Sequence, residues 1–210
     1  MPTRQEIRSE ETKRAILNAA RDLFAARGYD SVTMREIAKA AGCSHTTIYI
    51  YYTDKEALLH QLSMEPLQSL YQQMKTALQN PQLSPDDRLR SLCRTYIHFC
   101  LANRTMYTTF FMAKGSRVDE AEPALDVQQL RNQLFDLLRQ AVRGVLPAGA
   151  PDDQVLAYAR ILFFTLHGVL CTYPGNEEPL EHLMARLTPT FDLTVDVLLA
   201  GIKQTGGKAE

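Results

Sequence analysis

An excess of charge of one sign, paired cysteines and long apolar runs are all missing from this chain. The formal net charge is only −1, so no overall positive field attracts nucleic acid, and any DNA contact must come from local placement. The four cysteines form no CxxC pair, which argues against a disulfide framework. The longest apolar run, Ile161–Tyr173, contains His167 and is shorter than the about 20 residues that span a bilayer. Because no apolar run follows the charged N-terminus, we expect no signal peptide, no membrane partner and a reduced cytoplasmic protein.

Strand patterns are weak as well, whereas apolar residues recur with helical spacing almost throughout the 210 residues. We therefore predict an all-α fold. The N-terminal residues 1–55 should form a three-helix unit, and residues 56–210 a larger helical bundle. The first helix is expected to begin near residue 11, and the last near residue 188, with Pro189 at its start.

Residues 34–52, MREIAKAAGCSHTTIYIYY, have the pattern of two short helices joined by a tight turn. Ala38 must be small because the helices cross closely there, and Gly42 supplies the left-handed conformation of the turn. Ile48 anchors the second helix from beneath. This is helix-turn-helix geometry, which presents the second helix to the DNA major groove.

With this motif in place, residues 10–59 resemble the DNA-binding domain of the TetR family of bacterial transcriptional regulators. The matching segments are Thr12–Arg27, Gly28-Tyr29, Val32–Ala38, Ala41–Ser44, Thr47–Tyr49, Tyr51-Tyr52 and Asp54–Leu58. The resemblance implies a homodimer that reads a palindromic operator in double-stranded DNA, most often as a repressor. It also implies a C-terminal domain, residues 56–210, that dimerises and binds a small-molecule effector.

Side chains on and beside the second helix are candidates for DNA contact. Three in its first exposed turn can reach base edges, and two tyrosine hydroxyls on its flanks can meet phosphate. Ser44 caps this helix and leaves its N–H groups facing an anion. The predicted DNA-binding residues are Thr33, Arg35, Ser44, His45, Thr46, Thr47, Tyr49, Tyr51 and Lys55.

Arg35 and Lys55 sit in the first turns of helices, where a cation faces the positive end of the helix dipole. This placement costs roughly 0.3–1 kcal/mol, and a DNA phosphate at each site would reverse that cost. The alternative is that the neighbouring Glu36 and Glu56 offset the cations on a solvated surface. We favour the phosphate role for both, more strongly for Lys55, where the family resemblance agrees.

In the C-terminal bundle, a stripe of aromatic residues and methionine suits an adaptable apolar pocket, although any one such residue is more often plain core. The resemblance implies a cavity among these helices, so we expect a hydrophobic or aromatic ligand. Leu166-His167-Gly168 also resembles an element of one TetR subgroup that usually has a tryptophan nearby, and this chain has none. The predicted ligand-binding residues are Tyr96, Phe99, Met106, Phe110, Leu134, Leu138, Phe163 and His167.

Other function classes have weaker support. His167 and Cys171 share a helical face at a spacing that can hold a metal, but a third and fourth ligand are lacking, so we predict no metal site and no cofactor. Cys43 beside the second helix is a candidate redox gate, with buried packing as the alternative. No nucleophile elbow, phosphate loop or facing pair of carboxylates indicates an enzyme.

Overall fold

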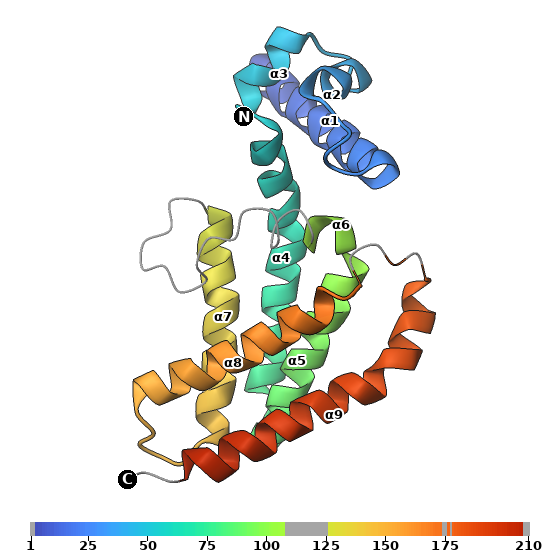
Figure 1. The fold of residues 1–210 in the computed structure, drawn as a ribbon. Helices are drawn as coiled ribbons and strands as arrows, with labels where there is room; N and C mark the ends of the chain where they lie inside the picture. The colour runs from blue at the N-terminus through green and yellow to red at the C-terminus, as the bar shows by residue number, and fades with distance from the viewer. Residues whose placement is uncertain (1–2, 108–125, 174–175, 177, 208–210) are drawn as a thin grey trace. The chain divides into compact units, whose positions relative to one another are not determined.

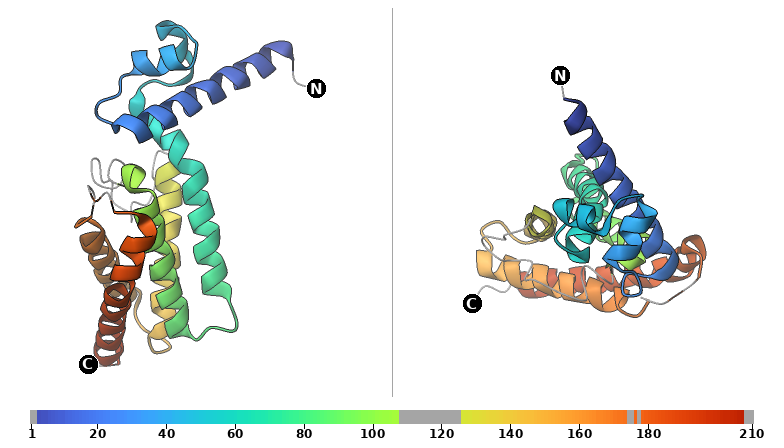
Figure 2. Two further views of the ribbon diagram at one scale, coloured as in Figure 1. Left: turned by 90° about the vertical axis from the view of Figure 1, so that its right-hand side faces the viewer. Right: turned by 90° about the horizontal axis from the view of Figure 1, so that it is seen from above.

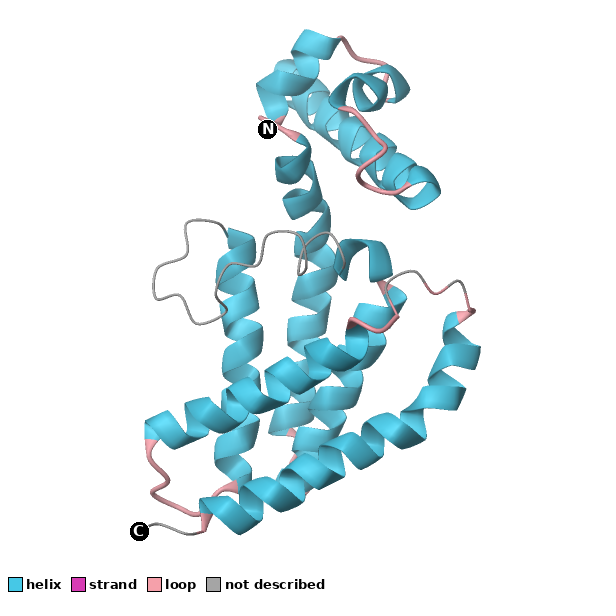
Figure 3. Ribbon diagram, viewed as in Figure 1, coloured by secondary structure: helices cyan, strands magenta, loops and turns pink. Residues whose placement is uncertain are grey.

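The computed structural model describes residues 3–107, 126–173, 176 and 178–207, and every regular element among them is a helix (Figures 1 and 3). The all-α prediction is confirmed. The described residues pack as two compact units, one of residues 3–66 with residues 105–107, the other of residues 67–104 and those from 126 to 207. The helices are α1 (Arg4–Arg27), α2 (Met34–Ala40), α3 (His45–Tyr51), α4 (Lys55–Gln79), α5 (Pro85–Ala102), α6 (Arg104–Tyr107), α7 (Asp126–Val145), α8 (Asp152–Leu170) and α9 (Leu180–Gly206).

Helix caps organise the N-terminal unit. α1 begins with a capping box, in which the backbone N–H of Thr3 donates to the Glu6 carboxylate and the N–H of Glu6 donates to the Thr3 hydroxyl. The expected start near residue 11 is therefore wrong, because this cap lies upstream of the first apolar repeat. The helix ends at Gly28, whose φ of 77° a side chain would disfavour.

A small hydrophobic core joins the helices of this unit. Its fully buried members come from α1, α2, α3, the first turn of α4 and the loop before α2. They are Ile16, Ala20, Phe24, Val32, Ile37, Ala38, Ile48 and Leu58.

α5 is the central helix of the C-terminal unit. It packs against α7, α8 and α9, as the views from two sides show (Figures 1 and 2). α7 contributes a broad apolar face to the same core. The buried residues of α5 are Leu89, Leu92, Cys93, Tyr96, Ile97, Cys100 and Leu101.

Two prolines lie inside long helices. α4 continues through Pro66, and α9 begins at Leu180 and continues through Pro189, so the prediction that Pro189 starts the last helix is wrong. A proline inside a helix removes one backbone hydrogen bond and bends the helix. Packing of Leu183, Leu187 and Phe191 into the core holds α9 together across that break.

Ion pairs link the surfaces of α5 and α9. Arg94 donates to both carboxylate oxygens of Asp192, at 2.5 and 2.8 Å, and Arg90 donates to Asp196 at 2.7 Å. Such exposed pairs each contribute little stability. Together they favour one register between two helices that are distant in sequence.

Candidate functional site

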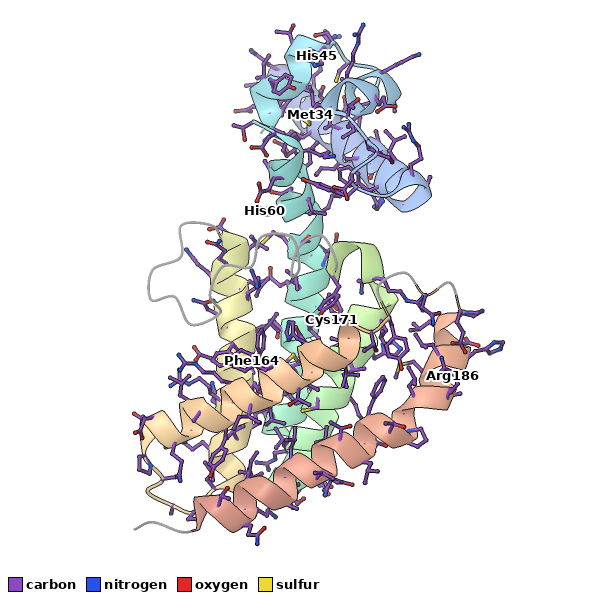
Figure 4. The ribbon with its side chains drawn as sticks, in the orientation of Figure 1. Met34, His45, His60, Phe164, Cys171 and Arg186 are labelled. Carbon is purple, nitrogen blue, oxygen red and sulfur yellow. The ribbon has the colours of Figure 1, made fainter. Side chains whose placement is uncertain are left out.

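The turn between α2 and α3 has the geometry that the sequence predicts. Ala38 is 1% exposed and Ile48 is fully buried, so both residues face the core. Gly42 has a φ of +69°, and a Cβ built there would meet nothing within 4 Å. The turn therefore needs glycine for its backbone conformation rather than for space. α3 is left with one face outward, where Figure 4 labels His45.

Three of the predicted DNA-binding residues are engaged in helix caps. The backbone N–H of Thr33 donates to the Glu36 carboxylate at 2.9 Å, and the N–H of Glu36 donates back to the Thr33 hydroxyl. The N–H of Thr47 donates to the Ser44 hydroxyl at 3.0 Å, and the hydroxyls of Ser44 and Thr47 lie 2.7 Å apart. These side chains fix the ends of α2 and α3, so the positions of the outward residues depend on them.

Four other predicted residues are exposed around α3 and the start of α2: Arg35, His45, Thr46 and Tyr49. The His45 ring packs edge-on against the Tyr49 ring, with centroids 5.1 Å apart, which orients both. Neither Arg35 nor Thr46 shows a hydrogen bond or ion pair from its side chain within the described part of the chain. Beside them, Ile50 is 75% exposed. An exposed helical turn with polar side chains on its surface can contact base edges and phosphates.

Tyr51 and Lys55 point inward instead. Tyr51 is half-buried and packs against the small core. The Lys55 ammonium donates to the carbonyl oxygens of Tyr29, at 2.6 Å, and Val32, at 2.9 Å, and its nitrogen lies 4.2 Å from the centroid of the Tyr29 ring. Lys55 therefore ties the loop before α2 to the start of α4, and one of its three N–H groups is left for another partner.

Arg27 makes a second tie that the sequence did not indicate. Its guanidinium donates to the Glu36 carboxylate at 2.8 Å and to the Ser31 carbonyl oxygen at 3.1 Å. The hydrogen bond from Arg27 and those from Thr33 lower the pKa of Glu36 to about 2. The end of α1, the loop and the start of α2 are thereby connected.

In the C-terminal unit, Tyr96 of α5 and His167 and Phe163 of α8 form an aromatic cluster. The Tyr96 hydroxyl lies 3.1 Å from His167 Nε2, and His167 Nδ1 lies 2.9 Å from the Phe163 carbonyl oxygen. The rings of Phe163 and His167 have centroids 3.9 Å apart. Both predicted ligand-binding residues of α7, Leu134 and Leu138, are buried nearby in the core of the same unit.

The hydrogen bonds of His167 fix its tautomer. A carbonyl oxygen only accepts, so Nδ1 carries the proton that it donates to Phe163. Burial lowers the pKa of His167 to about 4, with a further lowering by the charge of Arg131, so the ring is neutral near pH 7. Nε2 is then an acceptor, and the Tyr96 hydroxyl donates to it.

Arg131 of α7 is the residue that sequence reasoning missed in this cluster. It is only 6% exposed, and burial lowers the pKa of its guanidinium. The signal was present, since Val127, Arg131, Leu134 and Leu138 recur at the spacing of one helical face. The polar end of the cluster is thus formed by Tyr96, His167 and Arg131.

Of the remaining ligand predictions, Phe99 does not join this cluster. Phe99 lies one turn after Tyr96 on α5, but it lines a different cleft, with residues of α4 and α9. The Met106 side chain and Phe110 lie outside the described residues.

The alternative chemistries gain no support within the described part of the chain. It contains no group of three or more His, Cys, Asp or Glu side chains arranged to hold a metal. Partial burial raises the pKa of Cys43, the candidate redox residue, and burial raises that of Cys93 to about 12, so both thiols stay protonated. None of the described helices combines the length and the apolar character needed to cross a bilayer.

Comparison with known proteins identifies both halves of the chain. Residues 16–62 match the model of the bacterial regulatory proteins of the tetR family, and residues 89–198 match that of a tetracyclin repressor-like C-terminal domain. The HTH-type transcriptional regulator UidR of Escherichia coli K12 is 23% identical over 84% of this chain and 89% of its own.

Two solved structures share the fold. The regulator PfmR of Thermus thermophilus, at 21% identity, superposes with a TM-score of 0.59 and covers 95% of this chain and 97% of its own. The regulator FadR of Bacillus subtilis, solved in complex with stearoyl-CoA, has 17% identity, a TM-score of 0.57 and coverage of 90% and 97%.

Proposed function

Because the chain belongs to the TetR family of DNA-binding transcriptional regulators and not to the enzymes, we propose that it is a repressor released from DNA by a small effector. It would bind a palindromic operator as a homodimer in the bacterial cytoplasm. Residues 1–55 would read the DNA, and residues 56–210 would dimerise and bind the effector. The observation that carries this proposal is the outward face of α3. Helix caps fix the ends of α2 and α3, and the polar side chains of the outward face are exposed.

The roles at the DNA follow from how each side chain is engaged. His45 and Thr46 would reach base edges, because they are exposed in the first turn of α3. Arg35 and the Tyr49 hydroxyl would meet phosphates. Thr33, Ser44, Thr47 and Tyr51 would act mainly by positioning these residues, and the remaining N–H of Lys55 would be its only phosphate donor.

An apolar face on α8 and α9 supports the homodimer. Ile161 and Phe164 on α8 and Leu193 and Val197 on α9 recur at helical spacing, and all are exposed. Phe164 and Leu193 are each 63% exposed, which is costly for large apolar side chains in water. α8 and α9 also pack against each other. Two copies of this face would form an isologous four-helix interface.

The aromatic cluster of the C-terminal unit supports a hydrophobic or aromatic effector. Phe163 and the buried leucines of α7 offer apolar contact, while Tyr96, His167 and Arg131 offer a polar end for orientation. The stearoyl-CoA bound by the B. subtilis relative has a long apolar chain as well. Release would follow if the effector binds more tightly to a dimer whose DNA-reading helices no longer match the operator.

Selection of bound sequences from a random DNA pool by the purified full chain tests the proposal. We expect a palindrome with half-sites about one helical turn apart. The His45→Ala and Thr46→Ala variants should enrich a changed half-site. Recovery of an asymmetric sequence, or of none by a folded dimer, would contradict the proposal.

A further inference from the structure

A cleft of about 500 Å³ lies between α4, α5 and α9, apart from the aromatic cluster. Its apolar lining is formed by Ile97 and Phe99 of α5 and by Met184 and Phe191 of α9. This volume is within the range of about 300–1,000 Å³ that small-molecule sites occupy. All of its lining residues belong to the C-terminal unit.

A bend in α9 accompanies this cleft. Pro189 lies inside α9 and cannot donate a backbone hydrogen bond to the preceding turn. α9 bends in its N-terminal third, where Figure 4 labels Arg186. This bend precedes Pro189 in the chain, as expected for a proline inside a helix. Met184 and Thr188 therefore line one wall of the cleft, facing α5.

The cleft is on the opposite side of α9 from the exposed apolar face. Met184, Thr188 and Phe191 share one helical face, whereas Leu193 and Val197 lie roughly half a turn away from it. A partner that covers Leu193 and Val197 would therefore leave the cleft accessible.

Two threonines give the cleft a distinct hydrogen-bonding character. The Thr95 hydroxyl donates to the Ser91 carbonyl oxygen at 2.8 Å, and the Thr188 hydroxyl donates to the Met184 carbonyl oxygen at 2.6 Å. Each hydroxyl has only one proton, so both oxygens present lone pairs alone. Asn103 also donates one amide N–H to its own helix, at the Phe99 carbonyl oxygen, and keeps its second N–H and its amide oxygen. The two threonine oxygens therefore only accept hydrogen bonds, and a ligand that meets them must donate.

The charges around the cleft favour an uncharged ligand. Its described lining holds no carboxylate that could pair with a cation, and its ionisable side chains are Arg94 and His98. Its one arginine, Arg94, already donates to both carboxylate oxygens of Asp192, which reduces its attraction for an anion.

We propose that this cleft is a second ligand site, which binds an uncharged molecule with a small apolar body and a hydrogen-bond donor, such as an alkylphenol. The apolar body contacts Phe99, Met184 and Phe191, and the donor bonds the Thr95 or Thr188 oxygen. This second site depends only on the contacts within the cleft. It does not require that the effector that releases the protein from DNA binds at the aromatic cluster.

Binding of 4-ethylphenol to the full chain, measured by ligand-detected NMR titration, tests the proposal without DNA. The matched probe is 4-ethylanisole, which keeps the apolar body but has no donor. The Thr95→Val/Thr188→Val double variant removes both acceptors and keeps the side-chain shape. Its control is Thr165→Val/Thr194→Val, since Thr165 and Thr194 make the same bond to their own helices but do not line the cleft.

We expect 4-ethylphenol to bind about tenfold more tightly than 4-ethylanisole, since a missing hydrogen bond to an unpaired acceptor weakens binding by roughly this factor. The Thr95/Thr188 variant should lose about the same factor, while the Thr165/Thr194 variant should bind as the wild type does. Ala102→Trp, which fills the cleft from the end of α5, should abolish binding, with thermal unfolding confirming that the variant folds. Absence of binding, equal affinity for the two probes, or phenol binding unchanged by these cleft substitutions would overturn the proposal.

Discussion

The two units of this protein connect their helices over different distances in sequence. In the N-terminal unit, hydroxyls and carboxylates bond to backbone groups three residues away, as Thr33 with Glu36 and Ser44 with Thr47 do. In the C-terminal unit, the main surface ion pairs join α5 to α9, and Arg94 and Asp192 are 98 residues apart in sequence. Local caps keep a small unit rigid while its outward residues stay free. The arrangement of the C-terminal helices therefore depends on contacts between residues far apart in sequence.

Breaking the apolar face of α8 and α9 should have the largest effect on function. The Phe164→Asp/Leu193→Asp variant should be monomeric by sedimentation, because two charges would be buried at the proposed interface. Its operator affinity should fall about 100-fold or more, since two linked reading units gain that much from avidity. Ile7→Asp places a charge at an exposed apolar position outside this face and should leave the protein dimeric. A dimeric double variant would refute this interface.

The buried His167 should make the C-terminal unit sensitive to acid. Its pKa is about 4 in the folded state against an ordinary 6.5, so between these values the unfolded chain binds a proton that the folded chain does not. Stability should therefore fall as pH drops from about 6.5 to 4, by about 3 kcal/mol in total. His167→Gln should remove this component when unfolding free energies are measured across the range. Parallel pH profiles for the variant and the wild type would contradict the assignment.

Lys55 and Arg35 allow a comparison between a cation that is bonded inside the N-terminal unit and one that is exposed on its surface. Lys55→Met should lower the free energy of unfolding by about 1–3 kcal/mol, because the Tyr29 and Val32 carbonyl oxygens lose a charged donor. It should also reduce the salt dependence of operator binding, through the third N–H. Arg35→Gln should leave stability within about 0.5 kcal/mol and reduce the salt slope by about 0.9, the value for one phosphate that is no longer neutralised.

Chemical denaturation and a salt titration of operator binding measure both effects. A salt slope unchanged by Lys55→Met would leave that residue a purely structural role. An unchanged slope for Arg35→Gln would show that Arg35 contacts no phosphate.

Thr46 and Thr47 give the smallest and most local comparison. Thr46→Ala should change base preference at one half-site position, by about 1 kcal/mol, with stability unchanged. Thr47→Ala should cost stability through its hydrogen bond with Ser44 and leave base preference as it is. Selection from a random pool and thermal unfolding, applied to both variants, would show whether the two roles are instead exchanged or shared.

Local features of the N-terminal unit could be predicted from the sequence. The Ser44 cap of α3, the turn at Gly42 and the buried Ile48 each depend on residues a few positions apart. The contacts of Lys55 could not be predicted in this way. Its place in a first turn indicated an anion, whereas the structure supplies carbonyl oxygens from Tyr29 and Val32, more than 20 residues away in the chain.

In the C-terminal unit, tertiary packing determines several contacts and helix boundaries that could not be predicted from the sequence. Tyr96 and Phe99 are neighbours on one turn of α5, yet Tyr96 meets α8 and Phe99 faces the cleft beside α9. Pro189 has the local signature of a helix start, but packing carries α9 through it. Arg131 has the spacing of a core residue, and its charge suggested a surface position.

Comparing an intact palindrome with a single half-site shows whether the protein reads DNA as a dimer. The duplexes are a selected operator and the same DNA with one half-site scrambled, and the measurement is fluorescence anisotropy with the full chain. We expect two chains on the intact operator and an affinity at least about 100-fold weaker for the half-site duplex. Equal affinity for both duplexes, or one chain per operator, would contradict a dimeric reader built on α3.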